Sequence, residues 1–338
     1  MTRHGTAAAA AALLALGTLA ACSESDSIAP AASSGASLSQ TTTSDGSGVL
    51  TTAKVNKTEP QNLDRTRFNI TLKYVVPMTA EQKAVFEDAA RHWERVIIAD
   101  IPSISGTIPS AFAGMEPASS TVIDDLVIEV ALTEIDGAGV PGRNVLGSAG
   151  PRYLRLADGL PLSGVMYFDT YDLGLMAERG IFDEVIKHEM GHVLGVGSLW
   201  NLGAPFPVRQ LRTGTAAAAN YAFTGKYANQ HWSAEGGVGL VPVANVGAAG
   251  SIGSHWRESV MTNELMTPSI GVTSTTPLSR ITAASMRDLG YGIGTVGEQY
   301  DLPKGSLGEV EANAATVAAG GVNIAESEEL LAPVGVVE

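Results

Sequence analysis

One short segment of the chain has residue types and a spacing that could perform metal chemistry. His188 and His192 flank Glu189 in the run His188-Glu189-Met190-Gly191-His192, which matches the H-E-x-x-H pattern. Residues four apart lie on one side of a helix, so both imidazoles can reach a single zinc ion. The carboxylate between them can accept a proton from an activated water. We therefore predict a zinc site with His188 and His192 as ligands and Glu189 as the catalytic base.

The residues around this motif have the spacing of an amphipathic helix. Apolar side chains recur at intervals of four, four and three residues from Phe182 to Val193, which places them on one stripe. The histidines then lie on a neighbouring face. A helix with two surface histidines is the alternative, but a carboxylate beside two imidazoles favours a metal site. We expect a helix over residues 180–194 with its apolar stripe in the core.

The third zinc ligand must come from elsewhere in the chain. A catalytic zinc ion usually takes three protein ligands and a water. The compact zinc-protease signature would place the third ligand ten residues after His188, where the chain has Ser198. His92 lies on a helix that packs the core and is interpreted as a surface histidine. The residues alone leave three candidates for the third ligand, namely His231, His255 and Glu258.

Hydrophobic periodicity predicts the elements that must position these side chains. Apolar residues alternate with polar ones from Phe68 to Tyr74, as in a half-buried strand, and Thr79 resembles the N-cap of a long amphipathic helix. A Gly-rich connection separates the two later strands. Those strands are predicted at 126–132 and 164–169, and a last helix at 281–289. The expected fold class is α+β.

The amino-terminal residues resemble an export signal. Arg3 precedes a short apolar run, and Leu19-Ala20-Ala21-Cys22 is similar to the lipobox of bacterial lipoproteins. We expect residues 1–21 to be a lipoprotein signal peptide, Cys22 to be lipidated, and 22–65 to be a flexible linker to the membrane. An ordinary secretory signal is the alternative. The chain is therefore expected to be an exported, membrane-anchored lipoprotein of the outer membrane or cell surface, with Ser23 favouring the outer membrane.

Composition limits the remaining possibilities. The formal net charge of −14 and a pI near 4.8 argue against nucleic-acid binding, which requires a basic surface. Cys22 is the only cysteine, so no disulfide can form within the chain. Residues 295–338 are acidic, rich in Ala and Gly and without periodicity, which predicts a disordered tail. The folded domain is expected to span residues 66–294.

Two longer stretches resemble a known family. The run HEMGHVLGVGSLW and the later run GSHWRESVMTNELMTP are similar to the leishmanolysin family of metzincins, in which a long insertion precedes the third zinc histidine. Here 59 residues (196–254) separate Gly195 from His255. The resemblance implies that His255 is the third ligand and that Met266 belongs to the Met-turn beneath the metal. It covers nearly all of residues 66–294.

The same resemblance carries expectations about fold and activity. It implies a metzincin-like zincin domain, with a twisted mixed sheet packed on two long helices and an irregular, loop-rich C-terminal subdomain. The implied function is a zinc metalloendopeptidase that holds one catalytic zinc ion and hydrolyses polypeptide substrates outside the cytoplasm. The strand at 165–168 is expected to offer an edge for an extended substrate. The alternative is a zinc-containing surface-binding lipoprotein whose closed, structural site takes His231 as a fourth ligand.

Overall fold

The computed structural model of the chain describes residues 51–53, 66–137, 145–215, 218–247, 252–271, 276–294, 297–298, 300, 302 and 309–338. The predicted signal peptide and Cys22 lie outside these residues. Among the helices of the described parts, none has both the length and the apolar character needed to cross a bilayer.

The described residues form strands and helices in the following order. The strands are β1 (Thr51–Ala53), β2 (Ile70–Tyr74), β3 (Ile104–Ser105), β4 (Val122–Ile123), β5 (Leu126–Thr133), β6 (Gly147–Arg155), β7 (Pro161–Asp169), β8 (Gln210–Thr215), β9 (Ala218–Phe223), β10 (Val241–Val243), β11 (Ser269–Ile270), β12 (Val322–Asn323), β13 (Glu328–Leu330) and β14 (Gly335–Val337). The helices are α1 (Ala80–Val96), α2 (Thr170–Glu178), α3 (Phe182–Leu194), α4 (Lys226–Ala234), α5 (Glu258–Met261), α6 (Arg280–Leu289), α7 (Glu309–Ala318) and the 3-10 helix η1 (Ile324–Glu326).

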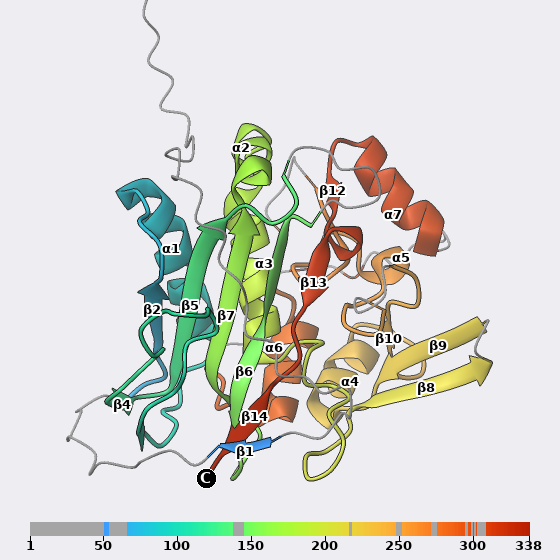
Figure 1. Ribbon diagram of the computed structural model, residues 1–338. Coiled ribbons are helices and arrows are strands. Elements are labelled where there is room, and N and C mark those ends of the chain that lie inside the picture. The colour runs from blue at the N-terminus through green and yellow to red at the C-terminus, as the bar shows by residue number, and fades with distance from the viewer. Residues whose placement is uncertain are drawn as a thin grey trace, which may run out of the picture.

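A twisted mixed sheet forms the centre of the fold (Figure 1). Its strands follow the order β1-β14-β6-β7-β5-β2, and β13 also pairs with β6. Strands β2, β5 and β7 are parallel to one another, whereas β6 runs antiparallel to β7. Helix α3 packs against β6, β7 and α1. The sheet and these two helices therefore enclose the main core.

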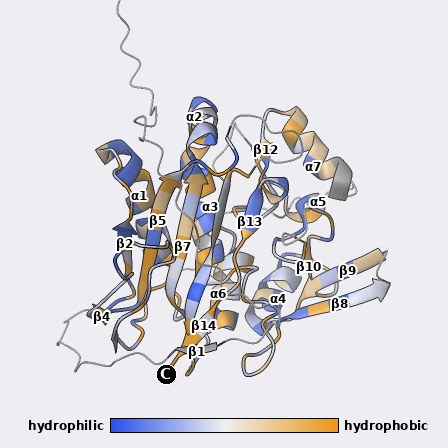
Figure 2. Ribbon diagram, in the orientation of Figure 1, coloured by the Kyte–Doolittle hydropathy of each residue, from blue (hydrophilic) through white to orange (hydrophobic). Residues whose placement is uncertain are grey.

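Apolar side chains explain this packing. All residues of β5 are buried, and orange, hydrophobic stretches mark β5 and β7 in Figure 2. Phe86 of α1 is fully buried and meets Phe182 of α3 with ring centroids 6.2 Å apart. Trp93, also fully buried, donates a hydrogen bond from its indole nitrogen to the Lys187 carbonyl at 2.9 Å. These contacts fix α3 relative to α1.

Local sequence signals set the ends of the predicted helices. Thr79 accepts a hydrogen bond from the Gln82 amide, and the Gln82 side chain accepts one from the Thr79 amide, which completes a capping box. Gly195 ends α3 with φ of 113°, a conformation that glycine adopts without strain. Gly290 ends α6 in a similar way, with φ of 122°. The predictions of α1, α3 and α6 are confirmed.

One strand was predicted as a connection, and this prediction is wrong. Residues 147–155 form β6, although glycines and a proline have low strand propensity. The glycines are needed because neighbours approach closely: a Cβ atom at Gly147 would meet the Phe168 ring, and one at Gly150 would meet the backbone of Leu331. The expected substrate edge at 165–168 is also wrong. These residues lie in β7, which is paired on both sides by β5 and β6.

The carboxy-terminal residues correct a further expectation. The tail 295–338 was expected to be disordered, but its described part contains α7, β12, η1, β13 and β14. Ile324, Val336 and Val337 are buried, and β13 and β14 pair with β6. Composition indicated disorder because it carries no information on such long-range pairing. Within the predicted linker, Thr51–Ala53 forms β1 and pairs with β14.

Candidate metal centre

Helix α3 places His188 and His192 side by side in the protein interior. Both side chains are fully buried, and their ring centroids lie 4.7 Å apart. Their Nε2 atoms are separated by 3.0 Å. The spacing of four residues along the helix produces this arrangement, as the motif predicts.

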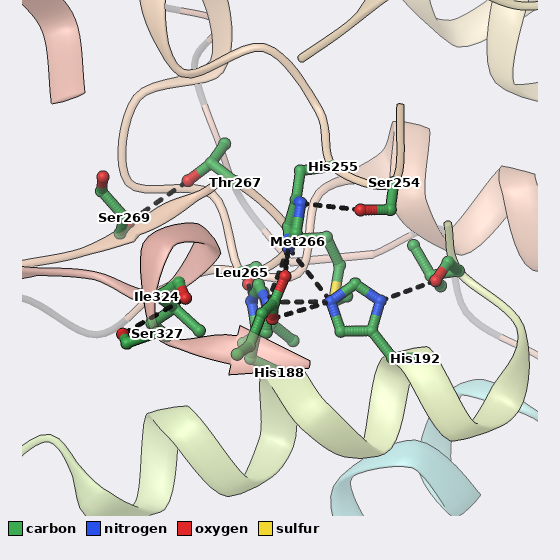
Figure 3. Close-up of polar contacts among 12 residues, drawn as sticks. His188, His192, Ser254, His255, Leu265, Met266, Thr267, Ser269, Ile324 and Ser327 are labelled. Carbon is green, nitrogen blue, oxygen red and sulfur yellow. Dashed lines mark hydrogen bonds and ion pairs between the residues drawn. The ribbon is translucent and has the colours of Figure 1, made fainter. Parts of the chain in front are cut away.

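A loop from the second half of the domain brings His255 to the same point. The backbone of Trp256 donates to the Met266 carbonyl at 3.0 Å, and its fully buried indole packs on Trp200 with ring centroids 4.6 Å apart. The Nε2 atom of His255 therefore lies 3.2 Å from that of His188 and 3.1 Å from that of His192. Figure 3 shows the three rings converging, two from α3 and one from the loop.

Hydrogen bonds at the Nδ1 atoms orient the imidazoles. Nδ1 of His188 donates to the Leu265 carbonyl at 2.6 Å, and Nδ1 of His192 donates to the Val196 carbonyl at 2.8 Å. Because a carbonyl oxygen only accepts, both Nδ1 atoms carry hydrogen, which leaves Nε2 as the nitrogen of each ring that can bind a metal. Nδ1 of His255 is hydrogen-bonded to the Ser254 hydroxyl at 3.1 Å. Such partners are typical of metal-binding histidines.

The geometry of the three Nε2 atoms fits one metal ion. Zinc–nitrogen bonds of about 2.0–2.1 Å in a tetrahedron place two ligand nitrogens about 3.3 Å apart. The observed separations of 3.0, 3.1 and 3.2 Å are close to this value. Lone pairs facing each other at such distances repel, so a cation between them would stabilise the arrangement. The donor set could therefore hold a metal ion.

A fourth group, Glu328 of β13, completes the cluster. Its Oε1 atom lies 2.9 Å from Nε2 of His255, and its Oε2 atom lies 3.5 Å from Nε2 of His188 and 3.6 Å from Nε2 of His192. The side chain is fully buried. His188, His192, His255 and Glu328 thus form a group that could bind a metal, with all four ligand atoms within 4.8 Å of one another.

Glu189 lies in the same buried region, on α3 between His188 and His192. Burial, and then the nearby charge of Glu328, raise the pKa of Glu189 well above its usual value. Burial also raises the pKa of Glu328, but the nearby His255 and His192 outweigh it and hold that pKa well below its usual range. Burial lowers the pKa of His192. The cluster therefore favours a protonated Glu189, an ionised Glu328 and a neutral His192.

Met266 packs against the metal-binding helix α3 at Gly191. Its side chain is fully buried, and the close-up shows its sulfur near the His192 ring (Figure 3). The buried Glu264 carboxylate holds this turn: it accepts from the Met266 amide at 2.6 Å, from the Ser279 amide at 2.9 Å, and from the Thr282 hydroxyl. The turn therefore has its own hydrogen-bonded support, which also fixes the Leu265 carbonyl that orients His188.

The other candidates from the sequence lie outside the cluster. His231 is half-buried on α4, and Glu258 accepts a hydrogen bond from the Thr316 hydroxyl at 2.9 Å. Neither belongs to the group of potential ligands around His188. His92 was expected on the surface, but it is buried beside Trp93. The buried face of α1 includes His92 as well as the neighbouring Trp93.

Sequence reasoning missed two residues of this region. Glu328 lies in a segment whose acidic composition indicated disorder, and only its parallel pairing with β6 brings it to the histidines. No short motif surrounds it. Glu264 directly precedes the Leu265-Met266 pair, so its place in the turn was visible, but its hydrogen bonds to residues 279 and 282 were not.

Comparisons with known proteins agree with these motifs. Residues 138–295 match the family model described as leishmanolysin, peptidase family M8. The matched stretch contains all three histidines of the cluster and ends before Glu328. A search of curated proteins gave no match. Over residues 138–295 the chain therefore resembles leishmanolysin, of peptidase family M8.

Proposed function

We propose that the protein is a zinc metalloendopeptidase that hydrolyses peptide bonds in proteins outside the cytoplasm. His188, His192 and His255 hold one zinc ion in this proposal. The observation that carries it is the convergence of their three Nε2 atoms within 3.2 Å of one another. The family match over the same residues supports polypeptides as the substrates.

Glu189 is the general base of the proposed reaction. When bound, zinc would supply Lewis acidity, which polarises a scissile carbonyl and acidifies water. In the proposed reaction, the Glu189 carboxylate accepts a proton from water and later delivers it to the leaving amine. Its Oε2 atom is buried and has no hydrogen-bond partner among the described residues. That oxygen is available to a reacting water or amide.

The metzincin-like character of the domain is part of the same proposal. Met266 gives the centre an apolar floor, since its buried thioether packs near the metal-binding helix. Residues 66–294 supply the catalytic domain. Because β13 and β14 are paired with β6, we add the carboxy-terminal strands to the folded unit.

We further propose that the chain is an exported lipoprotein. Residues 1–21 are the signal peptide, and Cys22 carries the lipid that anchors the protein to the outer membrane or cell surface. The sequence Leu19-Ala20-Ala21-Cys22, which follows an apolar run, supports this proposal. Substrates would then be proteins that reach this compartment.

A specific observation also favours the second candidate, a surface-binding lipoprotein with a structural zinc site. Structural zinc ions have four protein ligands, and Glu328 offers a fourth beside the three histidines. The buried Glu189 weighs against this reading, because a purely structural zinc site does not need the glutamate of the H-E-x-x-H motif.

Metal content and casein cleavage of four chains test the proposal. The chains are the wild type, Glu189→Gln, Glu328→Gln and the double variant. We expect one zinc ion per chain in all four. We also expect Glu328→Gln to cleave casein and the double variant, which adds Glu189→Gln, not to cleave it. If all four bind zinc and none cleaves casein, the structural-zinc reading replaces the endopeptidase. Glutamine has nearly the same shape as glutamate, so we expect all four chains to fold. Thermal unfolding of each chain checks this.

A further inference from the structure

The carboxy-terminal segment 322–337 crosses directly over the candidate metal centre. On one side, β12 pairs with β11, and the amides of Ile324 and Ala325 donate to the Pro268 carbonyl at 2.8 and 3.2 Å. On the other side, β13 and β14 follow β6 in parallel. The segment therefore joins the Met266 turn to the sheet, and the centre lies at the crossing point.

Glu328 is the residue that enters the centre at this crossing. Neighbouring backbone bonds fix its position: the Leu146 amide donates to the Ser327 carbonyl at 2.6 Å, and the Leu331 amide donates to the Ala149 carbonyl at 2.9 Å. The next residue, Glu329, is exposed although it lies on the same strand. Alternation along β13 thus sends one carboxylate to the histidines and the other to solvent.

Strand β13 also covers the edge of β6 that lies nearest the centre. Glu328, Glu329 and Leu330 are the partners of residues 147, 148 and 149. On its other side β6 pairs with β7, so β13 takes the only remaining edge over residues 147–149. An uncovered strand edge beside a catalytic centre is a surface on which an extended peptide can add as a strand. In this protein, β13 of the same chain occupies this edge of β6.

The contacts of Glu328 compete with those of a substrate. Its carboxylate lies between 2.9 and 3.6 Å from all three Nε2 atoms, two of which belong to the helix that carries the buried Glu189. A scissile carbonyl must approach the same metal and the same base. A tethered group has an effective concentration of about millimolar or more, so a free peptide competes poorly.

We propose that Glu328 is a fourth metal ligand and that residues 324–331 are an internal occupant of the peptide-binding edge, so that this chain is self-inhibited until the segment leaves β6. This inference rests on the proposed function. The protein segment is the inhibitor, and β6 with the three histidines is its docking surface. Release of Glu328 opens the fourth ligand position and the strand edge together.

Binding of acetohydroxamate to the cobalt-substituted full-length chain tests the proposal without relying on activity. Co²⁺ replaces zinc and reports its ligands through its visible absorption spectrum. The wild type is compared with Glu328→Ala, Glu328→Gln and the matched control Glu329→Ala, which removes an exposed carboxylate from the same strand. The Gln variant is nearly isosteric, so it serves if the Ala variant fails to fold, which thermal unfolding reveals.

We expect the hydroxamate to change the spectra of both Glu328 variants. It should also bind them roughly tenfold or more tightly than the wild type, because the state in which Glu328 has left the metal is rarely populated in the wild type. The Glu329→Ala control should behave as the wild type. Casein cleavage should rise by a similar factor in the Glu328 variants only. Equal hydroxamate affinity for all chains, with a metal-bound spectrum in each, overturns the inference and leaves the proposed function standing.

The two proposals fail in distinguishable ways. If the hydroxamate binds only the Glu328 variants but none of the chains cleaves casein, Glu328 is the fourth ligand and the endopeptidase assignment is wrong. If the wild type cleaves casein as fast as the Glu328 variants, the endopeptidase stands and self-inhibition is wrong. If no chain gives a cobalt spectrum, the histidines hold no metal and both proposals fail.

Discussion

Gly191 and Met266 are in such close contact that a side chain at position 191 has no room. A Cβ atom built on Gly191 would lie 2.6 Å from the Met266 sulfur and 2.8 Å from Cζ2 of Trp93. This glycine lies between His188 and His192 on the metal-binding helix. The close contact with Met266 therefore fixes the position of α3, and with it the positions of both imidazoles, relative to the Met266 turn.

We predict that Gly191→Ala destabilises the protein and weakens metal binding. Alanine favours a helix by about 1 kcal/mol over glycine, but overpacking against Met266 and Trp93 costs about 1–3 kcal/mol. Urea unfolding of the metal-free chain measures the net loss. Gly174→Ala on α2 is the control, because a Cβ atom there meets nothing within 4 Å. A Gly191→Ala chain that gains as much stability as the control would contradict the packing argument.

His255→Ala is expected to lose metal binding, whereas His231→Ala is not. His255 contributes one of three converging nitrogens, while His231 lies outside the cluster on α4. Substitution of groups that only orient ligands already costs about 10–100-fold in metal affinity, so the loss of a ligand should exceed this range. Competition with a chromophoric chelator gives the affinity of each variant. Similar losses in both variants would show that His231 also contributes to the site.

The stability of the metal-free chain should depend on pH through Glu189. Burial and Glu328 raise the folded-state pKa of Glu189 above its ordinary value of 4.5. The folded chain then retains a proton that the unfolded chain releases, so this group lowers stability as pH rises from 4.5 towards the folded-state pKa. Glu189→Gln should therefore be more stable than the wild type at pH 7 and about equal to it at pH 4. Thermal unfolding across this range tests the sign, and a constant difference would refute it.

Cys22 should determine where the protein is found. If its thiol carries the lipid, Cys22→Ser removes the anchor, and the chain moves from the membrane fraction to the soluble exported fraction. Ser25→Ala, three residues later, should remain in the membrane. Fractionation and immunoblotting of cells that express each full-length chain measure this distribution. A Cys22→Ser chain that stays in the membrane fraction would contradict the lipoprotein proposal.

Gly150→Ala should loosen the carboxy-terminal segment from β6. A Cβ atom at Gly150 would collide with the Leu331 backbone, so the strand pairing must open or shift. The Leu331 amide, which donates to the Ala149 carbonyl, should then exchange with deuterium faster than in the wild type. Amide exchange in β5 is the internal reference, because β5 pairs with β2 and β7 and not with Gly150 or Leu331. Unchanged exchange at Leu331 would mean that the segment tolerates the added methyl group.

Much of the fold could be predicted because its signals are local. The capping residues Thr79 and Gln82 begin α1, and the spacing of four residues brings His188 and His192 together, by rules that act within one or two turns of helix. The apolar run of β5 likewise indicates a buried strand. Each of these features depends on side chains close in sequence, so the sequence alone carries the information.

The remaining features depend on pairing between distant segments. Gly147 and Gly150 lower the strand propensity of β6, and only the approach of Phe168 and Leu331 explains why glycines are present. Glu328 reaches the histidines through parallel pairing with a strand about 180 positions earlier in the chain. Composition and periodicity contain no record of such partners. The fourth member of the cluster therefore had to come from the structure.

The long separation between His255 and Glu328 has a consequence for the order in which the centre is assembled. A ribosome adds about 5–20 residues per second, so the 73 positions from 255 to 328 take about 4–15 s to synthesise. Parallel pairing over a long loop is also a slow folding step. Each new molecule can therefore have its three histidines in place before Glu328 arrives. If folding follows this order, the fourth ligand position of the proposed metal site would stay open until β13 pairs with β6.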